Sequence, residues 1–284
     1  GKASLQTLGD VDNGRDAARF RPRGDQLVTV DTLTDFVGDP YSFARIAGMH
    51  AAGDLTVAGA QPTGCLASVG LAENHGDLPR RDLIQSRAGL DSLDLGSNLG
   101  GHTWVSEPPS LSLTLLGEAS ESLPARPCQP GDRVWVSRPL GSGLLLRGLM
   151  AGTVRGRSFD HWLAHAIAVS VDLQGVDAPI AMTDLTGFGL ALHLRSIVGE
   201  LAIQWTDDWK VWPGVDATLA STERASLAPA NLSAAWPDVA DLDPRRQALA
   251  VDPQTLGGVI AVWAAEYQPP APWQCVATLA SPIV

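Results

Sequence analysis

The feature that most constrains the fold of this chain is the alternation of strand-like and helix-like segments, broken once by a proline-rich stretch. Segments rich in Val, Thr and Leu, such as residues 26–33, alternate with segments whose apolar residues recur at helical spacing. The break at residues 121–132 contains three prolines and predicts a linker. Alternation on both sides of one linker favours two domains of the α/β or α+β class, which we place at residues 1–123 and 124–284.

Periodicity and boundary residues predict the individual helices and strands. Asp39 and Pro40 form a helix start, because Asp accepts hydrogen bonds from the first free N–H groups and proline fits the first helical position. In the first domain we predict helices from Pro40 and at residues 80–93, and strands at residues 26–33, 64–71, 95–105 and 111–117. In the second domain we predict helices at residues 143–150, 161–173 and from Gly189, and strands at residues 133–137, 179–183, 259–263 and 276–279. Residues 207–246 carry mixed signals and receive no element.

The charge balance restricts the partners. The chain carries 31 acidic and 20 basic residues, a net charge of −11, which argues against a nucleic-acid partner because its phosphates would be repelled. A nucleotide is compatible with this charge, since carboxylates can hold it through metal ions. We find no apolar run long enough to span a membrane and no signal-peptide pattern, and the three cysteines are widely spaced. These features predict a cytoplasmic protein with no membrane partner.

Lone aspartates beside small residues are the most informative polar pattern. Asp31 is expected to end the first strand and Asp184 to end the strand before Thr186, while Asp16 and Asp54 lie in short segments rich in Gly and Ala. A hard cation such as Mg²⁺ takes a few carboxylates together with substrate phosphates, so aspartates that converge would form such a site. For any one of them, a cap or turn role is the alternative.

Glycine motifs accompany these aspartates. They lie at residues 100–103, 141–143, 186–189 and 255–258. Glycines let a backbone approach phosphates closely, although glycine pairs also mark ordinary turns. Neither a P-loop nor a dinucleotide-binding glycine fingerprint occurs, so a P-loop enzyme and a Rossmann dehydrogenase are not supported.

The order of the motifs resembles that of a known family. The chain contains, in order, TVDTLTDFVGDPYSFARIAGMHAAGDLTVAGAQP, LGGHTWVSEPP, GDRVWVSRPLGSG, MTDLTGFGLALH and DPQTLGG. This series is similar to that of the selenophosphate synthetases (selenide, water dikinases), within the aminoimidazole ribonucleotide synthetase-like superfamily. The resemblance implies a two-domain fold whose N-terminal sheet pairs with that of a second copy in a homodimer. It also implies a C-terminal α/β domain and ATP held through Mg²⁺.

The resemblance also implies roles for individual residues. The implied magnesium ligands are Asp16, Asp54 and Asp184. The implied ATP-contacting residues are Asn13, Gly14, Arg15, Asp31, Asp54, Gly100, Gly101 and His102. Lys2 corresponds to a catalytic lysine that would bring a mobile positive charge over the phosphates.

Several positions depart from the family pattern. Arg15 stands where the family has a second Asp, which removes a carboxylate from the implied metal site and adds a positive charge. The family carries a Cys or selenocysteine ahead of its lysine, whereas the first cysteine here is Cys65. Since the sequence opens at Gly1 rather than at Met, we expect a processed chain or a piece of a longer one.

The function implied by the resemblance is ATP-dependent synthesis of selenophosphate from selenide, with AMP and phosphate as co-products. One alternative is another small-molecule kinase or synthetase of the superfamily, which the DPYSFARIA segment disfavours. A second alternative is a non-catalytic nucleotide-binding or dimerisation module, or a part cut from an oxidoreductase fusion. The absence of an early cysteine and the presence of Arg15 favour that alternative.

Overall fold

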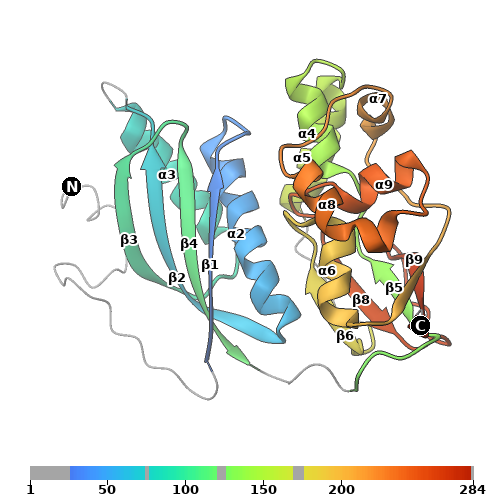
Figure 1. The fold of residues 1–284 in the computed structure, drawn as a ribbon. Helices are drawn as coiled ribbons and strands as arrows, with labels where there is room; N and C mark the ends of the chain where they lie inside the picture. The colour runs from blue at the N-terminus through green and yellow to red at the C-terminus, as the bar shows by residue number, and fades with distance from the viewer. Residues whose placement is uncertain (1–25, 74–76, 120–125, 169–175, 283–284) are drawn as a thin grey trace. The chain divides into compact units, whose positions relative to one another are not determined.

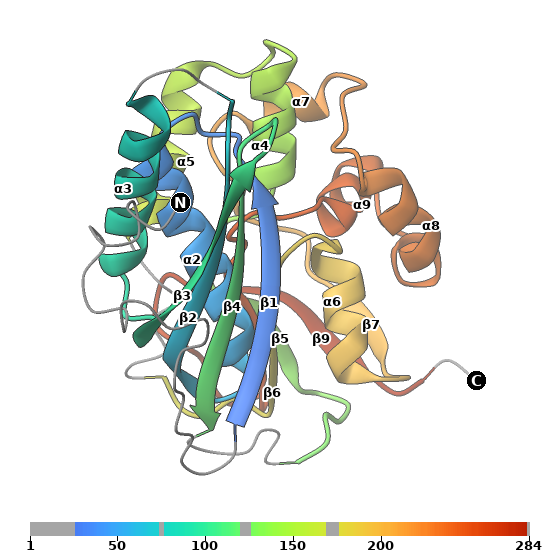
Figure 2. The same cartoon turned by 90° about the vertical axis from the view of Figure 1, so that its left-hand side faces the viewer.

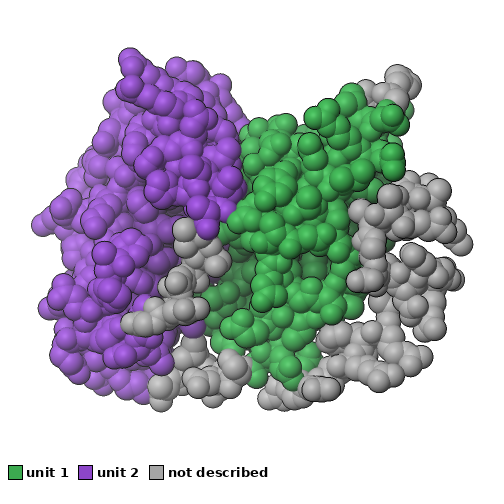
Figure 3. All heavy atoms as spheres, turned by 180° about the vertical axis from the view of Figure 1, so that it is seen from behind, with its two compact units in different colours: residues 1–122 green, residues 123–284 purple. Residues whose placement is uncertain are grey.

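The computed structural model describes residues 26–73, 77–119, 126–168 and 176–282 (Figure 1). The chain divides into two compact units, Gly1–Ser122 and Leu123–Val284, which are coloured separately in Figure 3. Each unit contains its own sheet with helices, so the fold is of the mixed α/β type. Among the described residues, no helix has the length and apolar character needed to cross a membrane.

Unit 1 is a four-stranded sheet in the order β1-β4-β2-β3, as Figure 2 shows. Its strands are β1 (Gln26–Thr34), β2 (Ala60–Leu71), β3 (Ser97–Val105) and β4 (Ser110–Ala119). The β4 strand pairs antiparallel with β1 and β2, and β2 pairs parallel with β3. The outer strands of the described sheet are therefore β1 and β3.

Two helices, α2 (Pro40–Val57) and α3 (Leu78–Asp91), cover one face of this sheet (Figure 1). The predicted start of α2 is confirmed: the Asp39 carboxylate accepts a hydrogen bond from Ser42 N at 2.8 Å, and Pro40 occupies the first turn. Helix α2 contributes Phe43, Ala47 and Leu55 to the core, which β4 completes with alternate leucines. This core fixes which side chains of each strand face the helices.

The opposite face of the unit 1 sheet carries exposed apolar side chains. In β1 the exposure alternates, and Val28 and Val30 are 66% and 63% exposed. The cross-strand register places Val30 in one row with Leu66 of β2, through β4. Leu66 and Trp104 are both more than a third exposed. Such a face normally stays in water only when it is small or serves as a contact surface.

Unit 2 is a five-stranded antiparallel sheet in the order β6-β8-β5-β9-β7. The strands are β5 (Arg133–Val136), β6 (Ala181–Asp184), β7 (Ala202–Trp205), β8 (Val259–Trp263) and β9 (Gln274–Ala280). The helices are α4 (Ser142–Met150), α5 (Gly156–Ala168), α6 (Gly189–Val198), α7 (Val215–Leu219), α8 (Ala228–Val239) and α9 (Pro244–Val251). All of β8 is buried, and α6 packs on β6 and β8.

The sequence prediction missed several elements. Residues 207–246 contain α7, α8 and the start of α9, and β7 lies just before them. These helices are short, and α8 holds Pro237 in its interior, so a helical period is hard to read there. The strand β2 begins earlier than predicted, because a register shift between Pro62 and Gly64 accommodates the proline. Helix α5 also begins earlier, at Gly156.

Candidate functional site

The residues singled out from the sequence fall into three places in the described structure and one set outside it. Asp31 and Asp54 lie at the β1 edge of unit 1, and the segment from Gly100 to His102 lies in β3 at the other edge. Asp184 belongs to unit 2. The remaining candidates lie outside the described residues: Lys2, Asn13, Gly14, Arg15 and Asp16.

The predicted range of the first strand, residues 26–33, agrees with β1, whereas the expectation that Asp31 ends this strand was wrong. The strand continues to Thr34, because every residue after Asp31 keeps its pairing with β4 down to Ser110. The carboxylate is half-buried and lies on the side of β1 that faces α2. A mid-strand position holds the backbone of Asp31 in the sheet, so its side chain is presented from a fixed place.

Asp54 lies in the last turn of α2. The Thr29 hydroxyl of β1 donates a hydrogen bond to the Asp54 carboxylate. This contact joins the end of the helix to the strand and aims the carboxylate at the β1 edge.

His50 joins this cluster, and the sequence prediction missed it. It lies one helical turn before Asp54, on the same face of α2, while Asp31 lies two residues after Thr29 on the same face of β1. A helical turn and two strand residues advance the chain by about 5–7 Å each, so the contact between Thr29 and Asp54 brings His50 beside Asp31. The four-residue spacing between His50 and Asp54 is a signal that the sequence already contained.

The electrostatics of the cluster follow from this proximity. Burial raises the pKa of Asp31, the nearby His50 lowers it, and Asp54 raises it. Burial lowers the pKa of His50, while Asp31 and Asp54 raise it. The Nδ1 atom of His50 is shielded from solvent and has no hydrogen-bond partner among the described residues. The cluster therefore presents the half-buried carboxylate oxygens of Asp31 and Asp54, with the shielded imidazole of His50 beside them.

The carboxylates of Asp31 and Asp54 provide some, but not all, of the ligands that a hard cation needs. Carboxylate oxygens are the ligands that Mg²⁺ takes, usually only one or two of them together with substrate phosphates. Across the part of the chain that the structure describes, no three His, Cys, Asp or Glu side chains are arranged to hold a metal ion by themselves. The carboxylates of Asp31 and Asp54 thus fit a metal that receives further ligands from a phosphate or from other parts of the chain.

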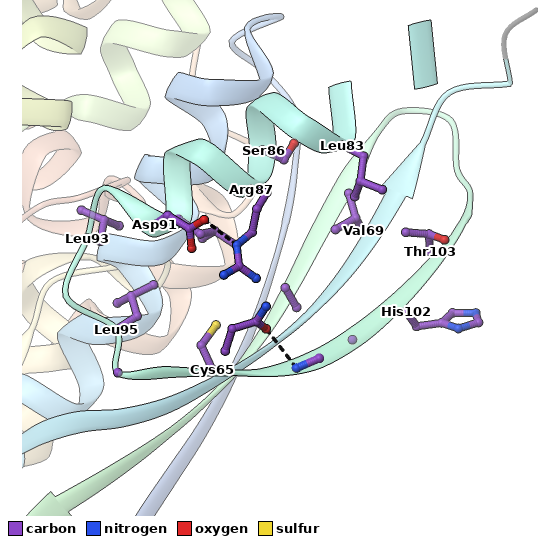
Figure 4. A pocket seen from close by; sticks show the side chains of 16 residues that line it. Cys65, Val69, Leu83, Ser86, Arg87, Asp91, Leu93, Leu95, His102 and Thr103 are labelled. Atoms are coloured by element: carbon purple, nitrogen blue, oxygen red, sulfur yellow. Dashed lines mark hydrogen bonds and ion pairs between the residues drawn. The ribbon is translucent and has the colours of Figure 1, made fainter. Parts of the chain in front are cut away.

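The β3 edge is chemically different. A cavity of about 150 Å³ lies there, between α3 and the strands β2 and β3 (Figure 4). Its walls are mainly apolar and include Cys65, Val69, Leu83, Leu90, Leu93 and Leu95. Two polar groups converge on it. Arg87 points inward while its Nε pairs with Asp91 at 2.6 Å, and the Asn98 Oδ1 accepts a hydrogen bond from Gly100 N at 2.9 Å.

Cys65 in this cavity is not suited to nucleophilic chemistry. Burial raises the pKa of its thiol to about 11, so the thiol stays protonated at neutral pH. The side chain is 7% exposed and packs with the core of unit 1, as its apolar sequence neighbours suggest.

The glycine segment beside the cavity is required by close packing. A Cβ atom on Gly101 would lie 1.7 Å from the carbonyl oxygen of Ala67, so only glycine fits against β2. Gly100 has a φ of +107°, a backbone conformation that favours glycine. The His102 side chain points away from the cavity in Figure 4 and stacks on Trp104, with 6.5 Å between ring centroids. It therefore belongs to the open face of the sheet.

The two edges are separated by the core of unit 1. One cross-strand row runs from Asp31 through Leu113 and Ala67 to Gly101. Three strand spacings separate the ends of this row by about 14 Å. Leu113 is 1% exposed and lies between them under the helices. On this face of one copy, buried core therefore lies between Asp31 and Gly101.

Asp184 occupies the position predicted for it, at the end of β6, where it pairs with Val259. The loop that follows is held by hydrogen bonds. Leu185 N donates to the Gly258 carbonyl at 2.9 Å, and Thr186 N donates to His193 Nε2 at 3.2 Å. The loop and the segment after α9 therefore fix each other around the half-buried Asp184.

The DPQTLGG motif, residues 252–258, lies beside this loop in unit 2. Gln254 Oε1 accepts hydrogen bonds from Gly141 N and Ser142 N at 3.1 Å each, and the Asp252 carboxylate accepts one from Leu144 N at 3.1 Å. Both side chains are buried, and burial raises the pKa of Asp252 to about 8. These contacts cap helix α4, so we assign the two side chains a structural role.

Comparisons with known proteins agree with this architecture. Residues 14–119 match the family model described as AIR synthase related protein, N-terminal domain. A selenide, water dikinase of Burkholderia ambifaria is 30% identical over 267 residues, which cover 88% of this chain and 75% of that protein. The crystal structure of thiamine-monophosphate kinase from Stenotrophomonas maltophilia K279a superposes with a TM-score of 0.68 at 20% identity, over 99% of this chain and 92% of that one. The hydrogenase maturation protein HypE in complex with ATP superposes with a TM-score of 0.62 at 18% identity, over 99% and 87%.

Proposed function

Because the chain belongs to the AIR synthase related superfamily and its curated relatives are selenide, water dikinases, we propose that it is an ATP-dependent phosphotransferase that makes selenophosphate from selenide. AMP and phosphate are the co-products of this proposed reaction. The observation that carries the proposal is the 30% identity to a selenide, water dikinase over 88% of the chain. The clustering of Asp31, His50 and Asp54 at one sheet edge adds independent support.

In this proposal the β1 edge receives the phosphates of ATP. Asp54, held by the Thr29 hydroxyl, and Asp31 present their oxygens from rigid elements, which suits positioning of a charged group. Mg²⁺ would neutralise the charge that develops on the transferred phosphoryl group. Its proposed ligands are Asp16, Asp54 and Asp184, and Lys2 is proposed to bring a positive charge to the phosphates.

The β3 edge is proposed to bind the other end of the nucleotide. Gly100 and Gly101 present a backbone without side chains next to an apolar cavity, which suits a flat base better than a phosphate. A crystal structure of HypE with ATP shows that a protein of this fold can hold the nucleotide.

Since one copy separates these two edges by the core around Leu113, we place the complete site between two copies of the chain. A symmetric dimer that sets β1 of one copy beside β3 of the other covers both sheet edges and the exposed face with Val28 and Val30. In such a dimer, Asp31 and Asp54 of one copy lie next to the glycine segment of the other. This arrangement is the proposed homodimer.

The test of the reaction is an assay of ATP consumption with and without selenide. Phosphorus NMR should show AMP, phosphate and a selenium-bound phosphorus only when selenide and Mg²⁺ are both present. ATP consumption that does not respond to selenide would instead point to another phosphotransferase.

A non-catalytic nucleotide-binding module is a second candidate. Arg15 next to Asp16 favours it, because a positive charge beside a metal ligand weakens cation binding. This candidate predicts that ATP stabilises the protein against heat but is not consumed. Replacement of Arg15 by Asp should then restore turnover if the lost carboxylate is the cause.

A further inference from the structure

Helix α5 of unit 2 carries a pair of histidines that the proposed function does not use. His161 and His165 are four residues apart and therefore lie on the same side of the helix, one turn from each other. Both are exposed, and their ring centroids are 4.4 Å apart with 47° between the ring planes. Two imidazoles are thus held side by side at the surface.

The orientation of His165 is set by its own helix. Its Nδ1 atom lies 2.9 Å from the carbonyl oxygen of His161. Since a carbonyl oxygen can only accept, Nδ1 carries the hydrogen and donates it, which leaves the lone pair of the neutral ring on Nε2. Metal-binding histidines commonly donate their second ring N–H to a backbone carbonyl in this way.

Neighbouring side chains restrict the pair further. The buried ring of Trp212 packs against both imidazoles, with centroids 6.3 Å from His161 and 5.8 Å from His165. Helix α5 itself is anchored by Trp162, which is fully buried. Because the rings are already confined, little rotamer freedom remains to be lost when both bind one ligand.

We propose that His161 and His165 form a binding site for a divalent transition-metal ion such as Zn²⁺, Ni²⁺ or Cu²⁺. Imidazole nitrogens suit these ions, whereas Mg²⁺ selects oxygen ligands. Two nitrogens that each lie about 2.0–2.1 Å from one ion are at most about 4 Å apart, and the 4.4 Å ring separation allows this.

The two imidazoles supply all the protein ligands that the described residues offer. No third His, Cys, Asp or Glu among those residues completes a metal cluster with the pair. Water or a small chelating molecule therefore fills the remaining positions. The resulting site is an open, exchangeable one whose protein ligands both come from helix α5.

The test is calorimetric titration of untagged protein with Zn²⁺ in the presence of excess Mg²⁺, which occupies carboxylate sites that prefer hard cations. The wild type should bind one Zn²⁺ per chain with micromolar affinity at neutral pH. His161→Gln and His165→Gln should each weaken this binding at least about tenfold. Asp160→Asn, an exposed neighbour on α5, is the matched control and should bind as the wild type does.

A second readout uses the neighbouring indole. Cu²⁺ bound to the pair should quench the fluorescence of Trp212. The Trp212→Phe variant should therefore show less quenching by Cu²⁺ than the wild type. The His165→Gln variant should lose the same part of the quenching, because it no longer holds the ion beside Trp212. Thermal melting without metal shows whether each variant is folded. Three results would overturn the proposal. Zn²⁺ binding could survive both histidine substitutions, it could disappear in Asp160→Asn, or the wild type could show no binding at millimolar Zn²⁺.

Discussion

The two edges of the unit 1 sheet present opposite chemistry on one scaffold. At the β1 edge, Asp31, His50 and Asp54 gather polar groups on a strand and a helix that are joined through Thr29. At the β3 edge, an apolar cavity and a glycine segment offer shape and backbone instead of charge. The first suits phosphate and metal, and the second suits a flat apolar body.

Under the proposed function, this difference places half of the nucleotide site in each copy. Both edges carry residues assigned to the same nucleotide, yet the row from Asp31 to Gly101 crosses the buried Leu113. The sheet order, rather than the motifs, creates this separation. The proposed second copy, with its β3 beside β1, would bring the two edges together.

The largest expected effect is at the β1 edge. Asp54→Asn keeps the shape of the side chain and an oxygen that can accept from Thr29, but it removes the charge that attracts a cation. ATP-dependent turnover should fall by about 100-fold or more. Replacing a residue that only supports a metal ligand already lowers metal affinity or activity by about 10–100-fold. Steady-state kinetics with Mg²⁺ measures this. Thr29→Val removes only the supporting hydroxyl and should lower turnover less than Asp54→Asn does. An Asp54→Asn enzyme with normal turnover would refute the charged role of this edge.

The next prediction concerns the exposed face between the edges. Val30→Glu places a charge on a side chain that is 63% exposed and points away from α2, so the fold of one copy should survive. Light scattering should show a dimer for the wild type and a monomer for the variant, and turnover should fall with the dimer fraction. Thr32→Glu on the same strand face tests how far this surface extends. A monomeric wild type with full turnover would break the two-copy account.

A smaller effect is expected at the β3 edge. His102→Ala removes a side chain that stacks on Trp104 outside the core. Its ring faces away from the cavity, so the test concerns the nucleotide contact that the family resemblance implies for His102 on the open face. If that contact forms, the change should weaken nucleotide binding by about 1–2 kcal/mol, close to tenfold, and leave turnover at saturating ATP nearly unchanged. Comparing KM with kcat separates this outcome from a loss of catalysis. An effect on kcat equal to that of Asp54→Asn would mean that the two edges do not divide their roles.

The smallest effect is a pH dependence of stability at the β1 edge. Burial lowers the pKa of His50 below its usual 6.5, so the unfolded chain binds a proton more readily than the folded one as the pH falls below 6.5. The wild type should lose stability in that range until the pH passes the pKa of the folded state. In thermal melts over the same pH range, the His50→Asn variant should lose less stability than the wild type. Identical pH profiles would show that His50 is not confined as the structure indicates.

Much of the fold could be predicted from the sequence, because strong local signals carry it. Asp39 and Pro40 marked the start of α2, and the Val-rich run of β8 was located at the residues where it lies. Asp184 was placed correctly because its strand is short and a glycine turn follows. In each case a boundary residue of clear chemistry lies next to a periodic segment.

Other features depend on tertiary structure and could not be predicted in this way. Asp31 was taken as a strand end because an alternating pattern does not show where pairing with β4 stops. His50 was missed although its four-residue spacing from Asp54 is visible in the sequence, because that spacing gains its significance only when α2 packs on β1. The separation of Asp31 from Gly101 follows from the strand order β1-β4-β2-β3, which no local motif encodes.

Complementation between two variants, each defective at one sheet edge, tests most directly whether two copies of the chain form one site. Asp54→Asn damages the β1 edge and His102→Ala damages the β3 edge, so a mixed dimer contains one intact site and one that is damaged twice. If each variant alone has low turnover at subsaturating ATP, unfolding and refolding them together should restore about a quarter of the wild-type rate, because half of the dimers are mixed and each regains one of two sites. Turnover of the mixture equal to the average of the two variants would contradict the account and place both edges in a site within a single copy.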